Sequence, residues 1–435
     1  MRFATRAPVR DCAGWTSIRE DKRYQSMRIP ASQVAAIASR TLVAVSVFLV
    51  ATLVAAASSP CQLPQAQAVD YPYPLLAPLP RDADARGGAL SWENGALAGR
   101  SAGGQYGDYL YHLPLALKNH YRYWLPPWSG NARFGFAVCL HPVEEYNVSR
   151  LHADWYVRYP GFDADPPPLF DLEFVQIIRL REGYSPPSQE AVERYAKEQP
   201  GTLWLIGNEP EDLNQDCKIP AEYAQLYYQW YNIIKAADPS AKVGIGGVVQ
   251  ATPLRLEWLD MVLQEYETRY GSKIPVDVWN VHGFILQEKL GSWGCQTPCG
   301  LSATQGKLYG TDDHDNMTIF KEQIVRFRQW MKDNGERNKP LIVSEYGILL
   351  SAGHGYGEAR VERFMIATFD YFLTATSSSL GYPADGNRLV QAWNWFSLDR
   401  KHFEGYETYA HLFDPVTKRI TALGRAYADY TGSLP

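Results

Sequence analysis

The sequence predicts an α/β protein in which a single (β/α)8 barrel follows a signal or anchor segment and a linker. Three observations point to this class. Between residues 131 and 435 short apolar runs alternate with helical patterns, the runs are apolar almost without interruption, and there are eight of them. Parallel strands that are buried on both faces have this composition, and strands alternating with helices form a parallel sheet. An open doubly wound sheet is the alternative arrangement.

The first 57 residues have the pattern of an export signal. Residues 42–57 are uncharged and apolar, Arg28 and Arg40 precede them, and small residues close the run, as in a secretory signal peptide. The run is shorter than the roughly 20 residues that span a membrane, and an uncleaved anchor is the alternative. Met27 is a second candidate start. In either case we expect a secreted protein or one on the extracytoplasmic cell surface, with membrane contact only through such an anchor.

Composition excludes several classes of partner. Residues 58–130 are rich in Pro, Gly and Ala, which predicts a linker partly packed on a barrel domain at 131–435. The net charge is -5 with no block of Lys or Arg, which argues against nucleic acid. The 13 Trp and 28 Tyr suit either large cores or clefts for flat, weakly polar ligands such as sugar rings. We expect a monomer.

The strand candidates are apolar runs with turn-forming or polar residues at their ends. In order they are RFGFAVCL, HADWYVRY, FVQIIRLR, TLWLIGNEP, KVGIGGVV, VDVWNVHGF, PLIVSEYG and LVQAWNWF. Segments 220–239 and 316–335 repeat apolar residues at helical spacing and predict two amphipathic helices between strands. The first helix is weakly marked, because HPVEEYNVSR offers at most two turns.

Two glutamates end strands of this predicted barrel. Glu209 follows the fourth strand in NEP, and Glu345 ends the seventh in SEYG. Such barrels carry their chemistry at the carboxyl ends of the strands, so the two glutamates should face each other across the mouth. Cleaving a glycosidic bond needs a protonated carboxyl for the leaving oxygen and an ionised one for the charge developing at the sugar carbon. Asn208 would bond the sugar's 2-hydroxyl.

Together these motifs resemble the clan A glycoside hydrolases. NEP after strand four, SEYG at strand seven, His at strand six and Trp at strand eight carry the resemblance over about residues 131–430. The resemblance implies a (β/α)8 barrel that retains anomeric configuration through a covalent intermediate. It also implies that Glu209 is the general acid/base and Glu345 the nucleophile. The member family is not placed, because the signatures of strands two and three are blurred.

Other candidate site residues lie at strands six and eight. By the resemblance, His282 lies close to Glu345 and tunes its ionisation, with a His bonded to a backbone carbonyl as the alternative. Tyr346 should point away from the site because strand side chains alternate. Trp393 and Trp395 share one face of the last strand. We expect one of them to form the sugar platform and the other a core layer.

The arginine assignment is open. Arg179 lies on the third strand and is a candidate partner of Glu345 or of a sugar hydroxyl, with a rim ion pair as the equal alternative. Clan members usually carry such an arginine one strand earlier, where this chain has Asp154, Trp155 and Tyr156. We include Trp155 among the candidate substrate contacts.

The six cysteines fit an oxidising compartment. Cys295 and Cys299 are close enough in sequence to form a disulfide that staples the long loop 283–316, which we expect to be a cleft wall. A zinc site would need a second ligand pair with suitable spacing, and the sequence offers none. No dinucleotide or phosphate motif is present, so neither metal nor organic cofactor is expected.

The sequence therefore predicts a secreted or surface retaining glycoside hydrolase that acts on a β-linked oligo- or polysaccharide. A catalytically silent carbohydrate-binding protein on the same barrel is the alternative, and a structural protein of the cell surface is a third option. The glycan, its linkage and endo or exo action cannot be read from these residues.

Overall fold

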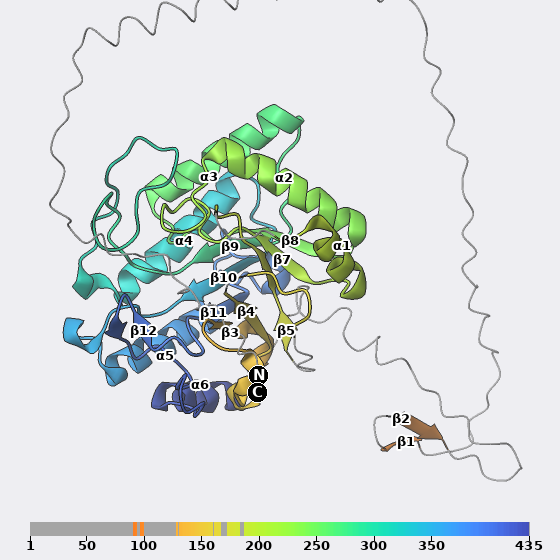
Figure 1. Cartoon of the computed structure of the whole chain (residues 1–435), viewed down its shortest axis with the longest axis vertical. Coiled ribbons are helices and arrows are strands. Elements are labelled where there is room, and N and C mark those ends of the chain that lie inside the picture. Colours follow the sequence, from red (N-terminus) through yellow and green to blue (C-terminus); the bar gives the residue numbers. More distant parts are fainter. Residues whose placement is uncertain are drawn as a thin grey trace, which may run out of the picture. The chain divides into compact units, whose positions relative to one another are not determined.

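The computed structural model describes residues 128, 130–159, 161–166, 172–182 and 187–434, and two short strands before them. Parallel strands follow one another around a barrel (Figure 1). They are β3 (Phe134–Val138), β4 (Trp155–Arg158), β5 (Glu173–Phe174) continued by β6 (Gln176–Ile178), β7 (Leu203–Ile206), β8 (Lys242–Ile245), β9 (Trp279–His282), β10 (Leu341–Tyr346) and β11 (Ala392–Trp395). Each of the eight predicted strands is present.

The ring of strands is closed. β11 pairs in parallel with β3, so the last strand meets the first. Val175, between β5 and β6, donates its N–H to the carbonyl of Tyr156 and keeps the third strand continuous. β8 and β9 are joined by isolated parallel bridges, one of them between Gly244 and Val278. The predicted (β/α)8 barrel is confirmed, and the open sheet is excluded.

Helices surround the barrel (Figure 1). They are α1 (Gln189–Glu198), α2 (Pro220–Ala237), α3 (Pro253–Tyr270), α4 (Met317–Asp333), α5 (Glu358–Thr374) and α6 (Ala422–Gly432). Both strongly marked helices are confirmed, and the side chain of Asn316 caps α4 by accepting from the N–H groups of Thr318 and Ile319. The weakly marked first connection forms only two 3-10 turns, η3 (Val143–Glu145) and η4 (Val148–Leu151).

Short elements complete the described part of the chain. They are the 3-10 turns η2 (Gly130–Arg133), η5 (Thr311–Asp313), η6 (Ala352–His354) and η7 (Pro383–Asp385), and the hairpin β12 (His402–Phe403) with β13 (Tyr406–Glu407). Separately, β1 (Leu90–Glu93) and β2 (Ala96–Gly99) pair antiparallel inside the predicted linker. The predicted signal segment lies outside the described residues. Within them, no helix is both long enough and apolar enough to cross a membrane.

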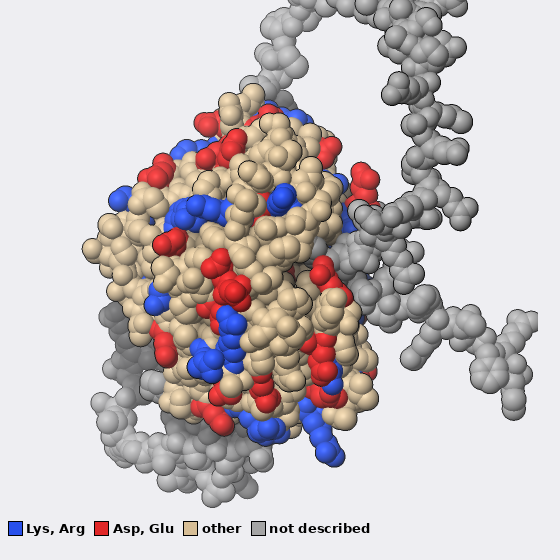
Figure 2. All heavy atoms as spheres, turned by 90° about the vertical axis from the view of Figure 1, so that its left-hand side faces the viewer, with Lys and Arg blue, Asp and Glu red and all other residues tan. Residues whose placement is uncertain are grey.

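Charges of both signs are mixed over the surface. On the face shown in Figure 2, acidic and basic side chains are interspersed. Some of the described surface charges pair with near neighbours, as Lys197 does with Glu193 one turn away on α1. Exposed pairs of this kind contribute little to stability. The charge distribution on this face therefore has no large field of one sign.

Apolar side chains fill two layers, one inside the barrel and one between strands and helices. On β7, for example, Leu203 and Leu205 belong to the inner layer, whereas Trp204 and Ile206 belong to the outer one. The alternation follows from the twofold period of a strand. This alternation decides which side chains at the carboxyl ends of the strands can reach the mouth of the barrel.

The loop after β11 is tied to the loop after β3 by Asp399. Its fully buried carboxylate accepts from the backbone N–H groups of Cys139 (2.9 Å), Leu140 (3.1 Å) and His141 (2.8 Å), and from the hydroxyl of Tyr146 (3.1 Å). A carboxylate removed from water needs such donors to replace its hydration. The network holds the ends of the first and last strands side by side.

Replacing Asp399 by asparagine puts an amide group where these donors converge, and should lower the free energy of unfolding by roughly 3 kcal/mol. Urea denaturation followed by tryptophan fluorescence measures the loss. The matched control is Asp429→Asn, an exposed position on α6, which should change stability by less than about 0.5 kcal/mol. Equal stability of the two variants would show that Asp399 does not hold the strand ends together.

Candidate active site

Glu209, His282 and Glu345 meet at the carboxyl ends of the strands. The Nδ1 atom of His282 lies 2.9 Å from Oε1 of Glu209, and its Nε2 atom lies 3.4 Å from Oε1 of Glu345. One side-chain ligand atom from each residue lies within 4.8 Å of the other two. All three side chains are buried. The predicted pair of glutamates is therefore brought together, with His282 between them rather than beside Glu345 alone.

The local backbone explains why these side chains converge. A Cβ atom on Gly247 would lie 2.4 Å from Cδ2 of His282, so only glycine leaves room for the imidazole ring. Glu209 has φ 42°, in the left-handed region that is uncommon for a residue with a side chain. Its N–H donates to the carbonyl of Gly247 (3.0 Å). Strained backbone of this kind gathers at functional sites, where the surrounding structure maintains it.

Burial sets the protonation states of this cluster. It raises the pKa of Glu209 from 4.5 to about 7, against the opposing effect of Arg255 and Arg179. Burial also lowers the pKa of His282 to about 3, and Arg179 adds to this effect. At neutral pH the imidazole is uncharged and carries one ring proton. We assign that proton to Nε2, which faces Glu345. Nδ1 can then accept a hydrogen bond from the carboxyl group of protonated Glu209. The histidine thus suits one protonated and one ionised glutamate.

Asn208 lies beside Glu209 in a fixed orientation. Its Oδ1 atom accepts from the hydroxyl of Tyr159 (2.8 Å), and its backbone N–H donates to Oδ2 of Asp216 (2.8 Å). Asp216 also accepts from Nε of Arg179 (2.9 Å). Arg179 is therefore in an ion pair, as one of the two equal alternatives for it held, but the pair is buried rather than on the rim, and it supports the backbone of Asn208. The sequence motifs did not identify Tyr159, which lies at the end of the second strand, because none of them includes a tyrosine at that position.

The pocket above the glutamates is narrow and largely apolar. Its described lining is Tyr159, Asn208, Glu209, Gln215, Val249, Phe284, Leu286, Glu345, Leu349, Phe396 and Phe403. The cavity volume of this pocket is about 30 Å³. Phe403, on the β12–β13 hairpin, is half-buried and lies at this mouth. The long loop 283–316 supplies Phe284 and Leu286, as expected for a cleft wall.

The expectation that Trp393 or Trp395 forms a sugar platform is wrong. Both are fully buried in the outer layer, where Trp393 packs on Phe372 and Trp395 on Tyr346. Side chains on β11 alternate, and the residue of that strand end that reaches the pocket is Phe396. The prediction that Tyr346 points away from the site is confirmed by the same packing.

Trp155 is also not a substrate contact. It fills the barrel near the start of β4, where its indole N–H donates to the carbonyl of Arg133 (3.3 Å). A Cβ on Gly135 would lie 2.7 Å from its ring, which shows how tightly this end of the barrel is packed. The pocket residue of the second strand is Tyr159, four residues further along the chain.

The predicted disulfide between Cys295 and Cys299 is wrong. Cys299 is bonded to Cys217, which lies in the loop after β7 and is 82 positions earlier in the chain. Cys295 remains a buried thiol. Closeness in sequence was misleading, because the loop turns between the two cysteines and presents Cys299 to the loop that carries Glu209. The disulfide therefore joins the loop after β7, which carries Glu209, to the loop after β9.

A buried arginine next to this disulfide gathers three carboxylates. Arg255 lies 2.5 Å from Glu211, 3.3 Å from Asp212 and 3.1 Å from Glu288, and all four side chains are fully buried. Burial raises the pKa of Glu211 to about 7 and that of Asp212 to about 6, with Arg255 opposing both shifts. The backbone N–H of Val249 also donates to Glu211 (2.9 Å). The cluster connects the loops that follow β7, β8 and β9.

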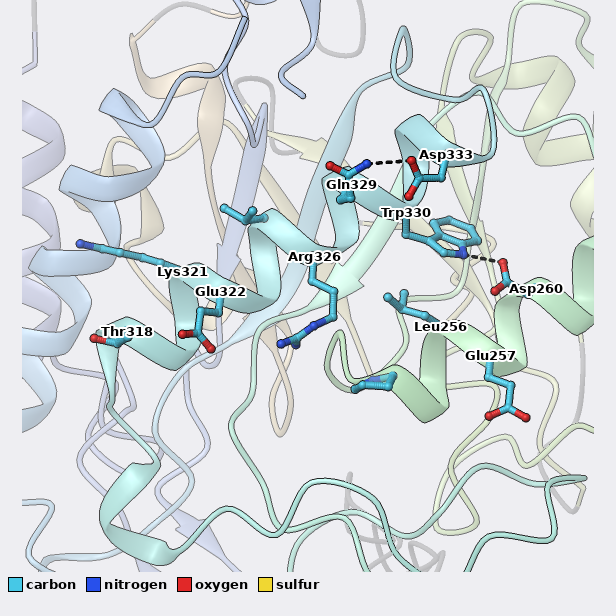
Figure 3. A pocket seen from close by; sticks show the side chains of 12 residues that line it. Leu256, Glu257, Asp260, Thr318, Lys321, Glu322, Arg326, Gln329, Trp330 and Asp333 are labelled. Carbon is cyan, nitrogen blue, oxygen red and sulfur yellow. Dashed lines mark hydrogen bonds between the residues drawn. The ribbon is translucent and has the colours of Figure 1, made fainter. Parts of the chain in front are cut away.

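A larger hollow lies elsewhere, between α3 and α4, with a volume of about 830 Å³ (Figure 3). Two of its carboxylates form hydrogen bonds with residues of these helices. Asp260 accepts from the indole N–H of Trp330 (2.6 Å), and Asp333 accepts from Gln329 (2.7 Å). The hollow contains neither Glu209 nor Glu345, so it is separate from the candidate site.

Among the described residues, the cluster with the composition of a metal site is Glu209, His282 and Glu345. Each ring nitrogen of His282 faces a different glutamate. A metal ion bound to one nitrogen would therefore have one glutamate beside it, while the other glutamate faces the opposite nitrogen. Sharing of protons among the three groups explains the arrangement without an ion.

The solved structures that this chain resembles include glycoside hydrolases. A GH128 (subgroup II) endo-β-1,3-glucanase from Sorangium cellulosum has a TM-score of 0.45 and 16% identity, over 70% of this chain and 98% of its own. A GH128 (subgroup I) endo-β-1,3-glucanase from Amycolatopsis mediterranei, in complex with laminaritriose, has a TM-score of 0.43 and 16% identity, over 68% and 98%. A glucosidase from Croceicoccus marinus has a TM-score of 0.45 and 13% identity, over 71% and 69%.

No protein-family model and no curated protein sequence matches the chain. The likeness to the solved structures is one of fold at low identity. The roles of individual residues therefore rest on the strand order and the distances within this chain.

The raised pKa of Glu209 predicts a pH dependence of stability. Between pH 4.5 and 7 the folded protein holds a proton on Glu209 that the unfolded chain releases, so the contribution of Glu209 to the free energy of unfolding falls as pH rises through this range. Glu209→Gln should remove up to about 1.4 kcal/mol per pH unit from that slope. Urea denaturation at pH 5, 6 and 7 measures the slope. Glu358→Gln, an exposed control on α5, should leave it unchanged, and equal slopes in the two variants would contradict the raised pKa.

Proposed function

We propose that this protein is a retaining β-glycoside hydrolase that cleaves O-glycosidic bonds by double displacement. The observation that carries the proposal is the buried contact of Glu209 and Glu345 through His282 at the mouth of the barrel. The raised pKa of Glu209 suits a general acid, and Glu345 lies nearby as the candidate nucleophile, so the site supplies the two carboxyl groups that this chemistry requires.

In the first step, the carboxylate of Glu345 attacks the anomeric carbon of the sugar. The bond from that carbon to the leaving oxygen breaks, and the oxygen takes the proton of Glu209. In the second step, ionised Glu209 removes a proton from water, whose oxygen displaces Glu345 from the sugar. With its proton on Nε2, His282 stabilises the negative charge of Glu345 before attack. Its Nδ1 atom holds the acidic proton of Glu209 in place.

The separation of the carboxyl groups supports retention. One oxygen of Glu209 and one of Glu345 lie within 4.8 Å. Retaining enzymes place the two groups about 5–5.5 Å apart, whereas inverting enzymes leave about 6.5–9.5 Å for a water molecule. A direct covalent intermediate on Glu345 is therefore the route that this spacing favours.

We also propose that the protein acts outside the cytoplasm. The apolar segment at residues 42–57 is the sequence support for export. The Cys217–Cys299 disulfide adds to it, since disulfides persist in oxidising compartments.

The two glutamates are tested by substitution and chemical rescue. With aryl β-glycosides as substrates, Glu345→Gly should lose nearly all activity, and added azide should restore it with formation of the α-glycosyl azide. Glu209→Ala should slow glycosides with poor leaving groups by about 10²–10⁴-fold, and azide should yield the β-glycosyl azide. NMR of the products identifies each anomer.

For the wild-type protein, the same measurements should show that the first-formed sugar keeps the β configuration. The value of kcat/KM should fall above about pH 7, where Glu209 loses its proton. An α product formed first would overturn retention. A folded wild type that binds glycans but hydrolyses none would favour the silent carbohydrate-binding protein instead.

The hydrogen bond from Tyr159 to Asn208 predicts a positioning role. Tyr159→Phe removes the hydroxyl that orients the amide, so kcat/KM should fall about tenfold, corresponding to one lost hydrogen bond of about 1.4 kcal/mol. The loss should be much smaller for the matching 2-deoxy substrate, which has no 2-hydroxyl to bind. Equal losses on both substrates would mean that Tyr159 does not act through Asn208.

A further inference from the structure

Strand β10 contains one extra residue just before Glu345. Val343 and Glu345, which are two positions apart, lie opposite consecutive residues of β9, so Ser344 is the extra residue in this register. The register of β10 with β11 is shifted in the same stretch, between Val343 and Tyr346. The backbones pair again directly after it, where the N–H of Gly283 donates to the carbonyl of Glu345 (2.8 Å). An extra residue of this kind is a β-bulge, which redirects the side chains that follow it.

The bulge determines the direction of Glu345. Val343 belongs to the outer layer, so an unbroken alternation would also turn Glu345 outward, toward the helices. Instead, Tyr346 packs in the outer layer, three positions after Val343. The extra residue therefore lets Glu345 point to the inner side of the barrel, where its Oε1 atom lies 3.4 Å from Nε2 of His282.

The N–H group of Ser344 is bonded to a side chain of the neighbouring strand. Its acceptor is Oδ1 of Asn280 on β9 (3.2 Å). Nδ2 of the same amide donates to the carbonyl of Ile245, the last residue of β8 (3.4 Å). Asn280 is buried, and it lies two residues before His282 on the face of β9 that points into the barrel. One side chain therefore links three neighbouring strands next to the candidate site.

The partners of Asn280 fix the orientation of its amide group. An N–H donor must face the amide oxygen and a carbonyl must face the amide nitrogen, so the reverse orientation would lose both hydrogen bonds. A Cβ atom on Gly247 would lie 3.0 Å from Nδ2 of Asn280. The glycine that leaves room for His282 thus also leaves room for this amide. Without the acceptor, the buried N–H of Ser344 would have to find another partner, and the bulge would change its shape.

We propose that Asn280 is a positioning residue, which holds the bulge at Ser344 and thereby aims Glu345 at the anomeric carbon of the sugar. This inference rests on the proposed glycosidase function, in which Glu345 is the nucleophile. Asn280 acts through the backbone of Ser344 and not through contact with the sugar. Its effect therefore belongs to the rate of nucleophilic attack rather than to substrate affinity.

The test isolates the attack by Glu345. In a dinitrophenyl 2-deoxy-2-fluoro-β-glycoside, the leaving group departs as dinitrophenolate with the bonding electrons and needs no proton from Glu209. The carboxylate oxygen bonds to the anomeric carbon, and the fluorine slows the second step, so the protein is inactivated. The sugar is the one released fastest from a panel of p-nitrophenyl β-glycosides by the full-length protein. The rate constant of inactivation at saturation then measures nucleophilic attack.

Two substitutions of Asn280 differ in what they remove. Asn280→Leu has no acceptor for the N–H of Ser344, so the rate constant at saturation should fall about 10²-fold, as expected when a reacting group is misplaced. Asn280→Asp keeps the acceptor oxygen and, when protonated, also the donor, so it should react at least about tenfold faster than the leucine variant. The reagent concentration at half-saturation should change by less than about twofold in both variants.

Asn232→Leu is the matched control. It makes the same replacement at an exposed position on α2 and should react like the wild type. In every variant kcat/KM should still fall above about pH 7, where Glu209 loses its proton. A weaker affinity together with a shifted pH profile would mean a general loosening of the site and would contradict the proposal. If thermal unfolding shows that Asn280→Leu is not folded, Asn280→Ala removes the same acceptor with a smaller side chain.

Crystal structures of the wild type and the variants separate this inference from the proposed function. The carboxylate of Glu345 should lie further from Nε2 of His282 in Asn280→Leu than in the wild type, and should keep its position in Asn280→Asp. If the wild type is inactivated and Asn280→Leu reacts equally fast, the positioning role is overturned while the glycosidase function stands. If the wild type neither hydrolyses a glycoside nor is inactivated, but the carboxylate moves as expected, the role of Asn280 in the bulge is supported and the glycosidase function is overturned.

Discussion

The contact of Arg255 with three buried carboxylates is the interaction on which the mouth of the barrel depends. Taking these charges out of water costs several kcal/mol per group, and the cost is recovered only when every partner is in place. Glu211 comes from the loop after β7 and Glu288 from the loop after β9, while Arg255 begins α3. The Cys217–Cys299 disulfide joins the first two of these loops covalently. The loops around the catalytic candidates are therefore ordered as one unit.

The fixed positions of these loops determine the protonation of the candidate site. The same unit excludes water from Glu209, and the loss of hydration raises the pKa of its carboxyl group to about 7. The imidazole of His282, equally buried, stays neutral and shares its two nitrogens between Glu209 and Glu345. The scaffold thus supplies the acid chemistry that we propose.

Sequence reasoning located the glutamates because its rules are local. Glu209 and Glu345 each follow an apolar run, and the carboxyl ends of parallel strands necessarily share one face of the barrel. The same reasoning failed for Trp395 and Trp155. A strand's side chains alternate between two layers that are both apolar in a barrel, so hydrophobicity alone cannot show which face a tryptophan occupies. Phe396, one position after Trp395, reaches the pocket.

The sequence by itself determined the eight strands, the two strongly marked helices and the strand ends that carry the catalytic candidates. These features depend on periodicity and on residues close together in the chain. Only the tertiary structure decided that Cys299 bonds Cys217, that His282 contacts both glutamates and that Tyr159 orients Asn208. Those contacts join residues 49 to 82 positions apart, and their distances are set by barrel closure and loop packing, which no local pattern encodes.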